Sequence, residues 1–469
     1  MSTWATASER SFATAFSTSD RVVRRAAVGR WCGDLVRVAS AALAVLFLVR
    51  LLGEPWPTKF PPVFPDTYSY LDIAKIGPFH PQFYVGERPM LYPLFLWVLG
   101  RNIGRTILAQ SILYVVAWGV LLRVATRRLQ PVVAVATGVG LLSIAVQSRF
   151  AFWNTELLSE SLSFTLALLV LALWWRAVAN GLARGVWPAV AVTCCWVAIR
   201  DTNAINAVAA ISVAAMLAGA MRWKLARPMR RRIIRAFAVC LIVSSACIAS
   251  AGVGHRARFG FYDVVGGRVL PDASLTQWFV DGGMPMNDTL KGRAGKDSWA
   301  DGETFLRSPD LTSFRRWAAG PGQRRFIASL VVRAPNWVAM LGSALPSMIG
   351  NGVDAYDNHG VRTRLPSTGI VRFVSPSSPT RFLLLLGGAL IALSTAFVAV
   401  RRRREVVVLT GLMLLAGLGD WYLSFVGDAV EYQRHSIGAV LRVNVAIVLA
   451  LAVAVDHCLR NRSASTMMT

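Results

Sequence analysis

Long apolar runs constrain this chain more than any other feature of its sequence. Ten such runs, most of them about 17 to 22 residues long, fall at 35–53, 106–124, 131–147, 157–178, 186–200, 204–221, 233–253, 382–400, 406–424 and 437–457. About 20 apolar residues in a helix cross the hydrocarbon core of a bilayer, and a helix satisfies its own backbone hydrogen bonds there. The sequence therefore predicts an all-α polytopic membrane protein with about ten transmembrane helices.

The composition agrees with a membrane protein and excludes a typical soluble one. Of the 469 residues, 55% are hydrophobic and only 16% are charged, whereas about a quarter of a soluble domain is charged. The net charge of +25 would suggest nucleic-acid binding in a soluble protein. Here the basic residues lie beside the apolar runs, where they determine membrane orientation. The lipid bilayer is therefore the expected partner, and nucleic acid is not.

Basic residues gather in alternate connections between the apolar runs. The groups lie in the N-terminal tail and at 123–128, 176–184, 222–235, 401–404 and 460–462. Short loops rich in Lys and Arg remain in the cytoplasm, and an even number of helices returns the chain to the side where it began. The sequence therefore predicts a multi-pass protein of the inner or plasma membrane with both termini in the cytoplasm.

Two long connections divide the chain into three parts. We expect an N-terminal transmembrane module at 1–253, with a first outer loop at 54–105, then an extracytoplasmic loop at 254–381, and C-terminal transmembrane helices at 382–469. Within the extracytoplasmic loop, the apolar stretch 326–349 is interrupted by charged residues and prolines. A crossing there would also reverse the orientation of every helix that follows. We therefore expect an interfacial or re-entrant juxtamembrane helix.

The first outer loop carries the densest group of functional candidates. Asp66 follows a proline close to the expected first helix, and a carboxylate held at the membrane surface can act as a general base. An alternative is that Asp66 is the N-cap of a short helix beginning at Tyr68, because Asp accepts backbone N–H groups at that position. Tyr70 and Tyr92 are candidates for substrate binding, with the alternative that they belong to the aromatic belt of the membrane interface.

Arginine and histidine side chains are expected at the same membrane surface. Arg88 lies in the first outer loop, Arg200 separates the fifth and sixth runs, and Arg434 with His435 separates the ninth and tenth. Charge-assisted hydrogen bonds from such groups stabilise a donor phosphate without a metal. We expect all four to bind that phosphate. The alternative is that Arg434 pairs with Glu431, and Arg200 with Asp201, as ordinary interfacial ion pairs.

Two acidic residues stand near the start of the fourth predicted helix. Glu156 and Glu160 are four positions apart, a spacing that places two side chains on one helical face. Carboxylates at membrane depth are costly to bury, and they are more often functional than structural. We therefore expect Glu156 and Glu160 to bind acceptor hydroxyls or to hold Arg88.

Four short motifs follow one another along the chain. They are Asp66-x-x-x-Tyr70, Arg88-Pro-x-x-Tyr92-Pro, the segment Asn154 to Ser161, and the stretch Phe326 to Trp337 with the Ala-Pro that precedes its last two residues. In this order they resemble the motifs of the GT-C glycosyltransferases, especially the bacterial branch that includes the mannosyl- and aminoarabinose-transferring membrane enzymes. The resemblance covers most of the chain, although each motif alone is short.

The resemblance implies a GT-C-like fold and an inverting transfer of a hexosyl or pentosyl group. The donor would be a polyprenyl-phosphate-linked sugar, and the acceptor a glycan, glycolipid or protein of the cell envelope. It also implies that Asp66 is the catalytic base. The family often has a second acidic residue beside the first, and Thr67 occupies that position here. We therefore assign no metal ligand and no required cofactor, and leave a divalent cation open.

Two other classes of function fit a polytopic membrane protein. A multi-pass transporter or lipid flippase would use buried carboxylates for proton coupling. A scaffold of an envelope assembly complex would leave Asp66 and Arg88 without a role. The expected acids lie at one membrane face and not at the midplane, and no inverted repeat is visible. The glycosyltransferase is therefore the leading hypothesis.

Overall fold

The structure is a computed structural model that describes residues 64–180, 185–220, 227–298, 300–349, 378–399 and 404–465. Helices account for all the regular secondary structure within these residues. Each of the nine apolar runs predicted after residue 100 falls on one or more of these helices. The first predicted run, at 35–53, lies outside the described residues.

Six described helices are long and apolar enough to cross a membrane. They are α5 (Ile103–Thr126), α8 (Ser159–Ala179), α11 (Arg227–Val253), α20 (Pro379–Ala399), α21 (Arg404–Gly427) and α22 (Tyr432–Ser465). Two bent helix pairs raise the number of candidate spans to eight if each pair crosses once. The chain is therefore an all-helical, polytopic membrane protein. The count of ten spans stays a prediction.

The fifth and sixth predicted spans form two apolar helices that are shorter than the six candidate spans. Helix α9 (Val186–Ile199) has 14 residues, which is about 21 Å of helix and less than the hydrocarbon thickness. Arg200 then has an extended backbone, and α10 (Asp201–Ala220) begins at once. The third predicted span is helix α6 (Pro131–Ala145), and a bend of 59° separates α6 from the short helices that follow it.

The predicted juxtamembrane helix at 326–349 is two helices, so a single continuous helix there is wrong. Helix α17 (Gln323–Val332) ends at Arg333, and α18 (Ala334–Ile349) leaves after a bend of 82°. Pro335 explains the break, because proline lacks a backbone N–H and its ring clashes with the preceding turn unless it stands in the first turn of a new helix. An interfacial or re-entrant position for this pair stays a prediction.

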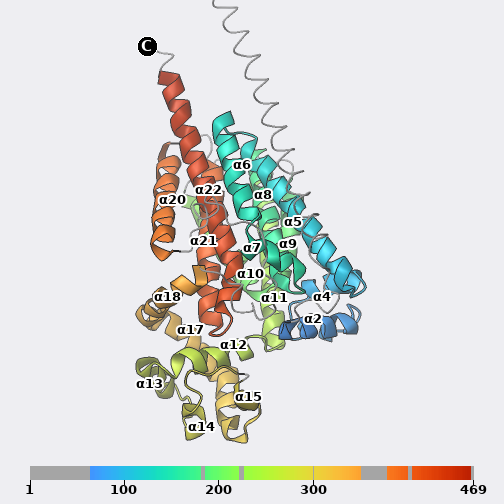
Figure 1. The fold of residues 1–469 in the computed structure, drawn as a ribbon, viewed down its shortest axis with the longest axis vertical. Coiled ribbons are helices and arrows are strands. Elements are labelled where there is room, and N and C mark those ends of the chain that lie inside the picture. Colours follow the sequence, from blue (N-terminus) through green and yellow to red (C-terminus); the bar gives the residue numbers. More distant parts are fainter. Residues whose placement is uncertain are drawn as a thin grey trace, which may run out of the picture.

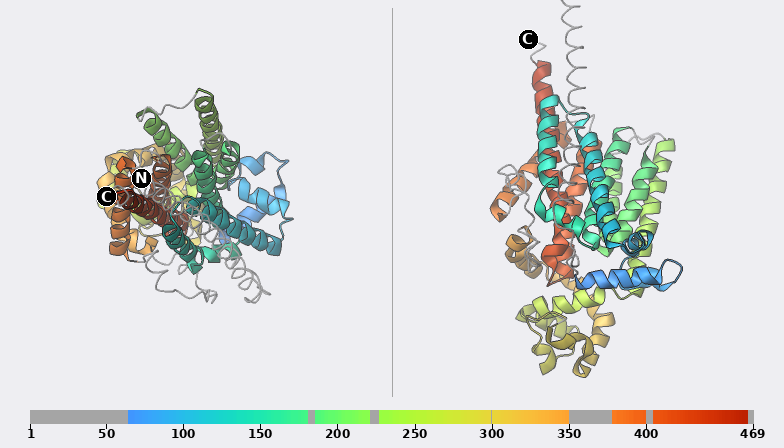
Figure 2. Two further views of the ribbon diagram at one scale, coloured as in Figure 1. Left: turned by 90° about the horizontal axis from the view of Figure 1, so that it is seen from above. Right: turned by 45° about the vertical axis from the view of Figure 1, so that its right-hand side comes forward.

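The long helices form a bundle with most of the connecting structure at one end (Figure 1). Helices α2 (Pro65–Ile76), α3 (Gln82–Val85) and α4 (Leu91–Val98) lie at this end. The last residues of α22 lie at the opposite end (Figure 1). We call the first of these the loop end. Helix α2 runs across the direction of α22 there, as Figure 2 shows in its right-hand view.

A small helical module occupies the loop end beyond the bundle (Figure 1). It runs from α12 to η4, and its helices are α12 (Ala257–Val264), η2 (Val265–Val269), α13 (Ala273–Asp281), α14 (Asp288–Lys291), α15 (Ala300–Arg307), η3 (Pro309–Leu311), α16 (Thr312–Trp317) and η4 (Ala318–Gly322). Its core is aromatic, with Tyr262 stacked on Phe305 at 5.9 Å between ring centroids. Gly260 lets α12 approach the carbonyl of Gly427 at the end of α21, where a side chain would not fit.

Candidate functional site

Asp66 lies in the first turn of α2, and its carboxylate contacts two arginines. The helix begins at Pro65, its N-cap is Phe64, and no side chain caps it. The predicted start at Tyr68 and the N-cap alternative for Asp66 are therefore wrong. One carboxylate oxygen accepts a hydrogen bond from Nη2 of Arg88, and the other accepts one from Nη2 of Arg434 at 2.6 Å.

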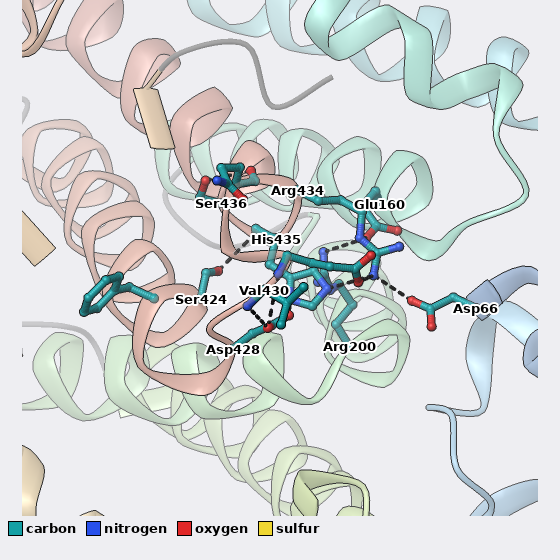
Figure 3. A network of polar contacts seen from close by, with 12 residues as sticks. Asp66, Glu160, Arg200, Ser424, Asp428, Val430, Arg434, His435 and Ser436 are labelled. Atoms are coloured by element: carbon teal, nitrogen blue, oxygen red, sulfur yellow. Dashed lines mark hydrogen bonds and ion pairs between the residues drawn. The ribbon is translucent and has the colours of Figure 1, made fainter. Parts of the chain in front are cut away.

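Arg434 is the most buried member of this cluster, with 2% of its side chain exposed. Its guanidinium group contacts three carboxylates: Asp66 at 2.6 Å, Glu431 at 2.5 Å and Glu160 at 3.5 Å. Figure 3 shows Arg434 between Asp66 and Glu160. The sequence alternative of an Arg434–Glu431 ion pair is confirmed, although that pair is only one of three. Nη1 of Arg434 is buried without a hydrogen-bond partner among the described residues.

The other two predicted arginines reach the same cluster from different segments. Arg88 donates to Oγ of Ser69 at 2.7 Å and lies over the ring of Tyr70, 5.1 Å from its centroid. Arg200 lies 3.8 Å from Glu160. Four regions far apart in sequence thus meet at the loop end of the bundle.

Asp201 does not pair with its neighbour Arg200, so that sequence alternative is wrong. Its carboxylate instead lies 3.0 Å from Nε of Arg256. Asp201 begins α10, whereas Arg200 keeps the extended backbone that separates α9 from α10. Arg200 therefore contacts the cluster through Glu160 on α8.

Glu156 and Glu160 do not share a helical face, which corrects the prediction from their spacing. Glu160 lies in the first turn of α8, while Glu156 has an extended backbone after the 3-10 helix η1 (Phe152–Thr155). Neither carboxylate holds Arg88, which pairs with Asp66. Glu156 is fully buried, and burial raises the pKa of its carboxyl group to about 8. It is therefore mainly a neutral acid at pH 7.

Tyr70 and Tyr92 are buried and form hydrogen bonds, so the membrane-belt alternative is wrong for both. The hydroxyl of Tyr70 donates to Oγ of Ser159 at 2.9 Å, and that of Tyr92 donates to Oε1 of Gln110 at 2.9 Å. The two rings meet edge to face, with centroids 4.9 Å apart. These contacts hold α2 and α4 against α5 and α8. They leave a direct contact of either tyrosine with substrate as a prediction.

The electrostatics of the cluster favour an ionised Asp66 and a partly protonated Glu431. Burial alone would raise the pKa of Asp66, but the charges of Arg434 and Arg88 outweigh it and hold the pKa below its ordinary value. Burial raises the pKa of Glu431 to about 7, although the charge of Arg434 opposes the rise. Arg434 therefore keeps Asp66 as a charged partner at pH 7, and Glu431 is the partner that gains a proton near neutrality.

Three side chains beside the cluster could hold a metal ion. Ligand atoms of Asp428, Glu431 and His435 all lie within 4.8 Å of one another. Nδ1 of His435 lies 3.2 Å from Asp428, and its Nε2 lies 3.0 Å from Nη2 of Arg434. The same Nη2 contacts Glu431, so a cation could use all three ligands only if Arg434 moved. These residues fit a cation poorly, and we assign no metal ligand.

Two buried arginines that the sequence did not single out hold the site in position. Nη1 of Arg256 donates to the carbonyl of Arg88 at 3.0 Å. Nη2 of Arg268 donates to the carbonyl of Asp428 at 2.9 Å, and its guanidinium group lies 3.6 Å from the ring centroid of Phe425. Both arginines lie in the long polar connection, where no apolar pattern marks them. Only the folded structure reveals their role.

A second polar contact lies deeper in the bundle. Asp420 on α21 pairs with Arg442 on α22 and accepts a hydrogen bond from Nδ2 of Asn206 at 3.0 Å. Only 7% and 5% of the Asp420 and Arg442 side chains are exposed. Both residues stand inside predicted apolar runs, and ionisable residues in such runs are a recognised functional signal.

The structure brings Asp66, Arg88, Arg200, Arg434, His435 and Glu160 into one connected cluster. None of the hydrogen bonds and ion pairs of the described residues joins Glu156 to these six. The ring of Tyr70 lies against the guanidinium group of Arg88, and Tyr92 packs against Tyr70. No protein-family model, curated protein or solved structure matches this chain. The chemistry of the site therefore has to be inferred from its own residues.

Proposed function

We propose that this chain is an inverting glycosyltransferase of the GT-C type. It would move a hexosyl or pentosyl group from a polyprenyl-phosphate donor to a glycan, glycolipid or protein acceptor of the cell envelope. The observation that carries the proposal is the position of Asp66 between Arg88 and Arg434. A base and two phosphate-binding groups are the minimum that this reaction needs without a metal.

The reaction consists of one displacement at the anomeric carbon. The acceptor hydroxyl oxygen forms a bond to that carbon from the face opposite the phosphate, and its proton passes to the carboxylate of Asp66. The bond between the carbon and the phosphate oxygen breaks at the same time, and the electron pair leaves with polyprenyl phosphate. Negative charge grows on that phosphate, and the guanidinium groups of Arg88 and Arg434 stabilise it.

Because Asp66 is paired with two arginines, its strength as a base depends on donor binding. A carboxylate held by two guanidinium groups is a weak base, because its pKa lies far below the operating pH. A donor phosphate that takes over Arg88 or the unused Nη1 of Arg434 would weaken these pairs and raise the proton affinity of Asp66. Its side chain is 22% exposed, against 2% for Arg434, so Asp66 is the more accessible of the two. Donor binding would thus prepare the base before the acceptor reacts.

The side of the membrane on which the reaction takes place is part of the same proposal. The loop end would face the extracytoplasmic side of the inner or plasma membrane, and both termini would lie in the cytoplasm. The basic connections of the sequence support this orientation through the rule that Lys and Arg remain inside.

A deletion strain complemented with variants tests the proposed function. Loss of the transferase should cause accumulation of a polyprenyl-phosphate sugar and a truncated envelope glycan, measured by lipid and glycan profiling. Wild type should restore both, and Asp66→Asn should restore neither although it reaches the membrane at the same level. Asp72→Asn is the matched control, because Asp72 is on the same helix but exposed and paired with Lys75.

Two outcomes of this experiment would contradict the proposal. A deletion strain with unchanged lipids and glycans would refute the transferase. Full rescue by Asp66→Asn would show that Asp66 is not the base, because Asn cannot accept the proton. A general base contributes roughly 10²- to 10⁴-fold to the rate. If Asp66 is the base, Asp66→Asn should therefore not restore the glycan within one growth cycle.

One observation favours a second candidate function, a transporter or lipid flippase. The Asp420–Arg442 pair is buried within two candidate spans, and intramembrane carboxylates often serve in proton coupling. If the protein is a transporter or flippase, Asp420→Asn should abolish movement of the substrate across the membrane. Transfer of sugar to the glycan would then be the work of another protein. In the transferase, Asp420→Asn should leave glycan transfer intact once the protein is folded.

A further inference from the structure

The segment from α2 to α4 presents apolar side chains to its surroundings. Phe79, in the turn after α2, is 91% exposed, and Val98 at the end of α4 is 66% exposed. We call residues 65–98 the paddle. Its tip consists of the exposed apolar residues Ile76, Phe79, Tyr84, Val85, Trp97 and Val98. A patch of this kind in contact with water would be unfavourable, because apolar groups gain free energy when they leave water.

The aromatic residues of the tip are held in fixed positions. Phe79 and Trp97 meet edge to face with ring centroids 6.1 Å apart. The hydroxyl of Tyr84 donates to the carbonyl of Pro78 at 2.9 Å, which closes the turn from the other side. The tip is therefore exposed in the folded structure without a rearrangement.

The apolar surface of the tip continues onto a membrane-spanning helix. Helix α5 begins at Ile103, a few residues after Val98, and is one of the candidate spans. Leu108, Ile112 and Val116 are 44%, 53% and 48% exposed. Their four-residue spacing places them on one face of the helix, which is the face that lipid must cover. The tip is thus next to a surface that already contacts the hydrocarbon region.

Two basic residues stand between the tip and this face. Arg101 and Arg105 are both exposed, and neither forms an ion pair within the described part of the chain. Arg101 has a positive φ of 57°, so the chain turns sharply where it leaves the paddle and enters α5. Basic residues beside an apolar surface are attracted to anionic lipid headgroups.

We propose that the paddle tip is inserted into the boundary between headgroups and acyl chains at the loop end, with Arg101 and Arg105 bound to lipid phosphates. Trp and Tyr are favoured at this depth because one end of each ring system is polar. Helix α2 runs across the bundle (Figure 2), so it would lie along the membrane surface. Its 12 residues span about 18 Å, with the tip at one end and Asp66 at the other.

The consequence concerns the depth of Asp66 in the membrane. A helix anchored flat by its tip holds its first turn at the level of the lipid phosphates. Asp66, and with it Arg88, is thereby kept at the depth where the phosphate of any membrane lipid lies. The insertion itself does not depend on the proposed reaction and can be tested separately from it.

Photo-crosslinking in vesicles tests the insertion directly. p-Benzoylphenylalanine replaces Phe79 in the full-length protein, which is reconstituted into equimolar phosphatidylcholine and phosphatidylglycerol. Ile112 on α5 provides the positive control, and Asp288, whose side chain is 98% exposed in the helical module, provides the negative control. We expect lipid adducts from positions 79 and 112 and none from 288.

The result that would overturn the proposal is equally direct. Lipid adducts at position 112 without any at 79 would place the tip outside the bilayer. Adducts of position 79 with protein would show that another polypeptide segment covers the tip, and would overturn it too. The same reconstituted protein can be assayed for glycan transfer, so a failed insertion and a failed transferase remain distinguishable.

Substitution of Arg101 and Arg105 tests whether these arginines bind lipid phosphates. Arg101→Gln with Arg105→Gln should lower the share of position-79 adducts formed with phosphatidylglycerol toward the value expected from an equimolar membrane, about one half, because two charges near an anionic surface are lost. Lys291→Gln, an exposed lysine of the helical module, should leave that share unchanged. An equal share in the double variant and the wild type would remove these arginines from the lipid contact.

Discussion

Asp66 and Arg434 stand 368 positions apart in the chain and form a 2.6 Å ion pair. Asp66 belongs to the first loop segment, and Arg434 lies in the first turn of α22. Their contact makes α2 and α22 depend on each other, because each charge would lose one of its partners if the other helix moved away. The site therefore exists only when nearly the whole chain has folded.

Removal of Arg434 should strongly destabilise the protein. Arg434→Gln removes the cation that Asp66, Glu160 and Glu431 share, and breaking a buried ion pair by removing one partner costs about 3–5 kcal/mol. The free energy of unfolding in detergent measures the loss. Arg307→Gln is the control, because Arg307 is 76% exposed in its pair with Glu303 and its loss should cost less than about 1 kcal/mol. The double variant Asp66→Asn with Arg434→Gln should lose less than the sum of its single changes. Simple additivity would argue against a coupled pair.

Neutralisation of Arg88 should weaken binding of a polyprenyl phosphodiester. One charge-assisted hydrogen bond contributes roughly 1.5–3 kcal/mol, so Arg88→Ala should raise the Kd of such a probe by about one to two orders of magnitude. Titration of the purified protein with the probe gives this value. Arg258→Ala provides a control, because Arg258 is an exposed arginine that stacks on Phe259 outside the site. Equal affinities of wild type and Arg88→Ala would remove Arg88 from the donor site.

Binding of the same phosphodiester should depend on pH through Glu431. Burial raises the pKa of Glu431 to about 7, and the charged groups around it are Arg434, Asp66, Glu160 and Arg88. Protonation below pH 7 removes a negative charge next to Arg434, so affinity should increase as pH falls. Between pH 8 and pH 6 the increase should be about tenfold.

The control for this pH effect is Glu431→Gln, which is neutral throughout. Its affinity should be nearly constant from pH 6 to pH 8 and close to that of wild type at pH 6. The probe carries one charge over this range, so its own titration does not contribute. The same pH dependence in wild type and Glu431→Gln would assign the effect to another group.

Arg256 should control the mobility of the segment that carries Arg88. It donates to the carbonyl of Arg88 and pairs with Asp201, so Arg256→Gln removes the tie between the first loop and α10. Amide hydrogen exchange at 86–90 should become faster, because local opening costs less free energy. Arg258→Gln, two residues away and exposed, should leave these rates unchanged. Unaltered exchange in Arg256→Gln would show that other contacts hold the segment.

Reporter fusions test the orientation on which the proposed sidedness depends. Fusions at Gly282, in the helical module, and at Arg402, which lies outside the described residues, should report opposite sides of the membrane. An alkaline phosphatase fusion should be active at Gly282 and inactive at Arg402. The same activity at both positions would rule out the predicted orientation.

Sequence patterns predicted the helices well because the bilayer imposes a simple rule. A run of apolar residues in lipid has few alternatives to a helix, and each described run became one. The break at Arg200 was predicted, because this residue separates two apolar runs. The bend at Arg333 was harder to predict, since a charged residue at a helix end looks like one within a long helix. The single helix expected at 326–349 failed for this reason.

The candidate site was predictable in part because its residues carry charge near apolar runs. Asp66, Arg88, Arg200 and Arg434 were all expected at one surface, and they meet there. Their ion-pair partners were not predictable. Whether Arg200 pairs with Asp201 or with Glu160 depends on how α8 and α10 pack. Glu156 was placed on a helix by its spacing alone, and the helix begins three residues later.

Helix α22 carries Arg434 in its first turn and is fixed at its far end as well. There, Asp456 accepts the backbone N–H of Gln130 at 2.6 Å, and Arg460 donates to the carbonyl of Arg128 at 2.8 Å. Both attachments belong to one unbroken helix of 34 residues. Each added residue rotates one end of a helix against the other by about 100°. A single residue inserted between them would therefore turn Arg434 away from Asp66 while the far end stayed in place, so the rotational register of this helix is what brings the two charges together.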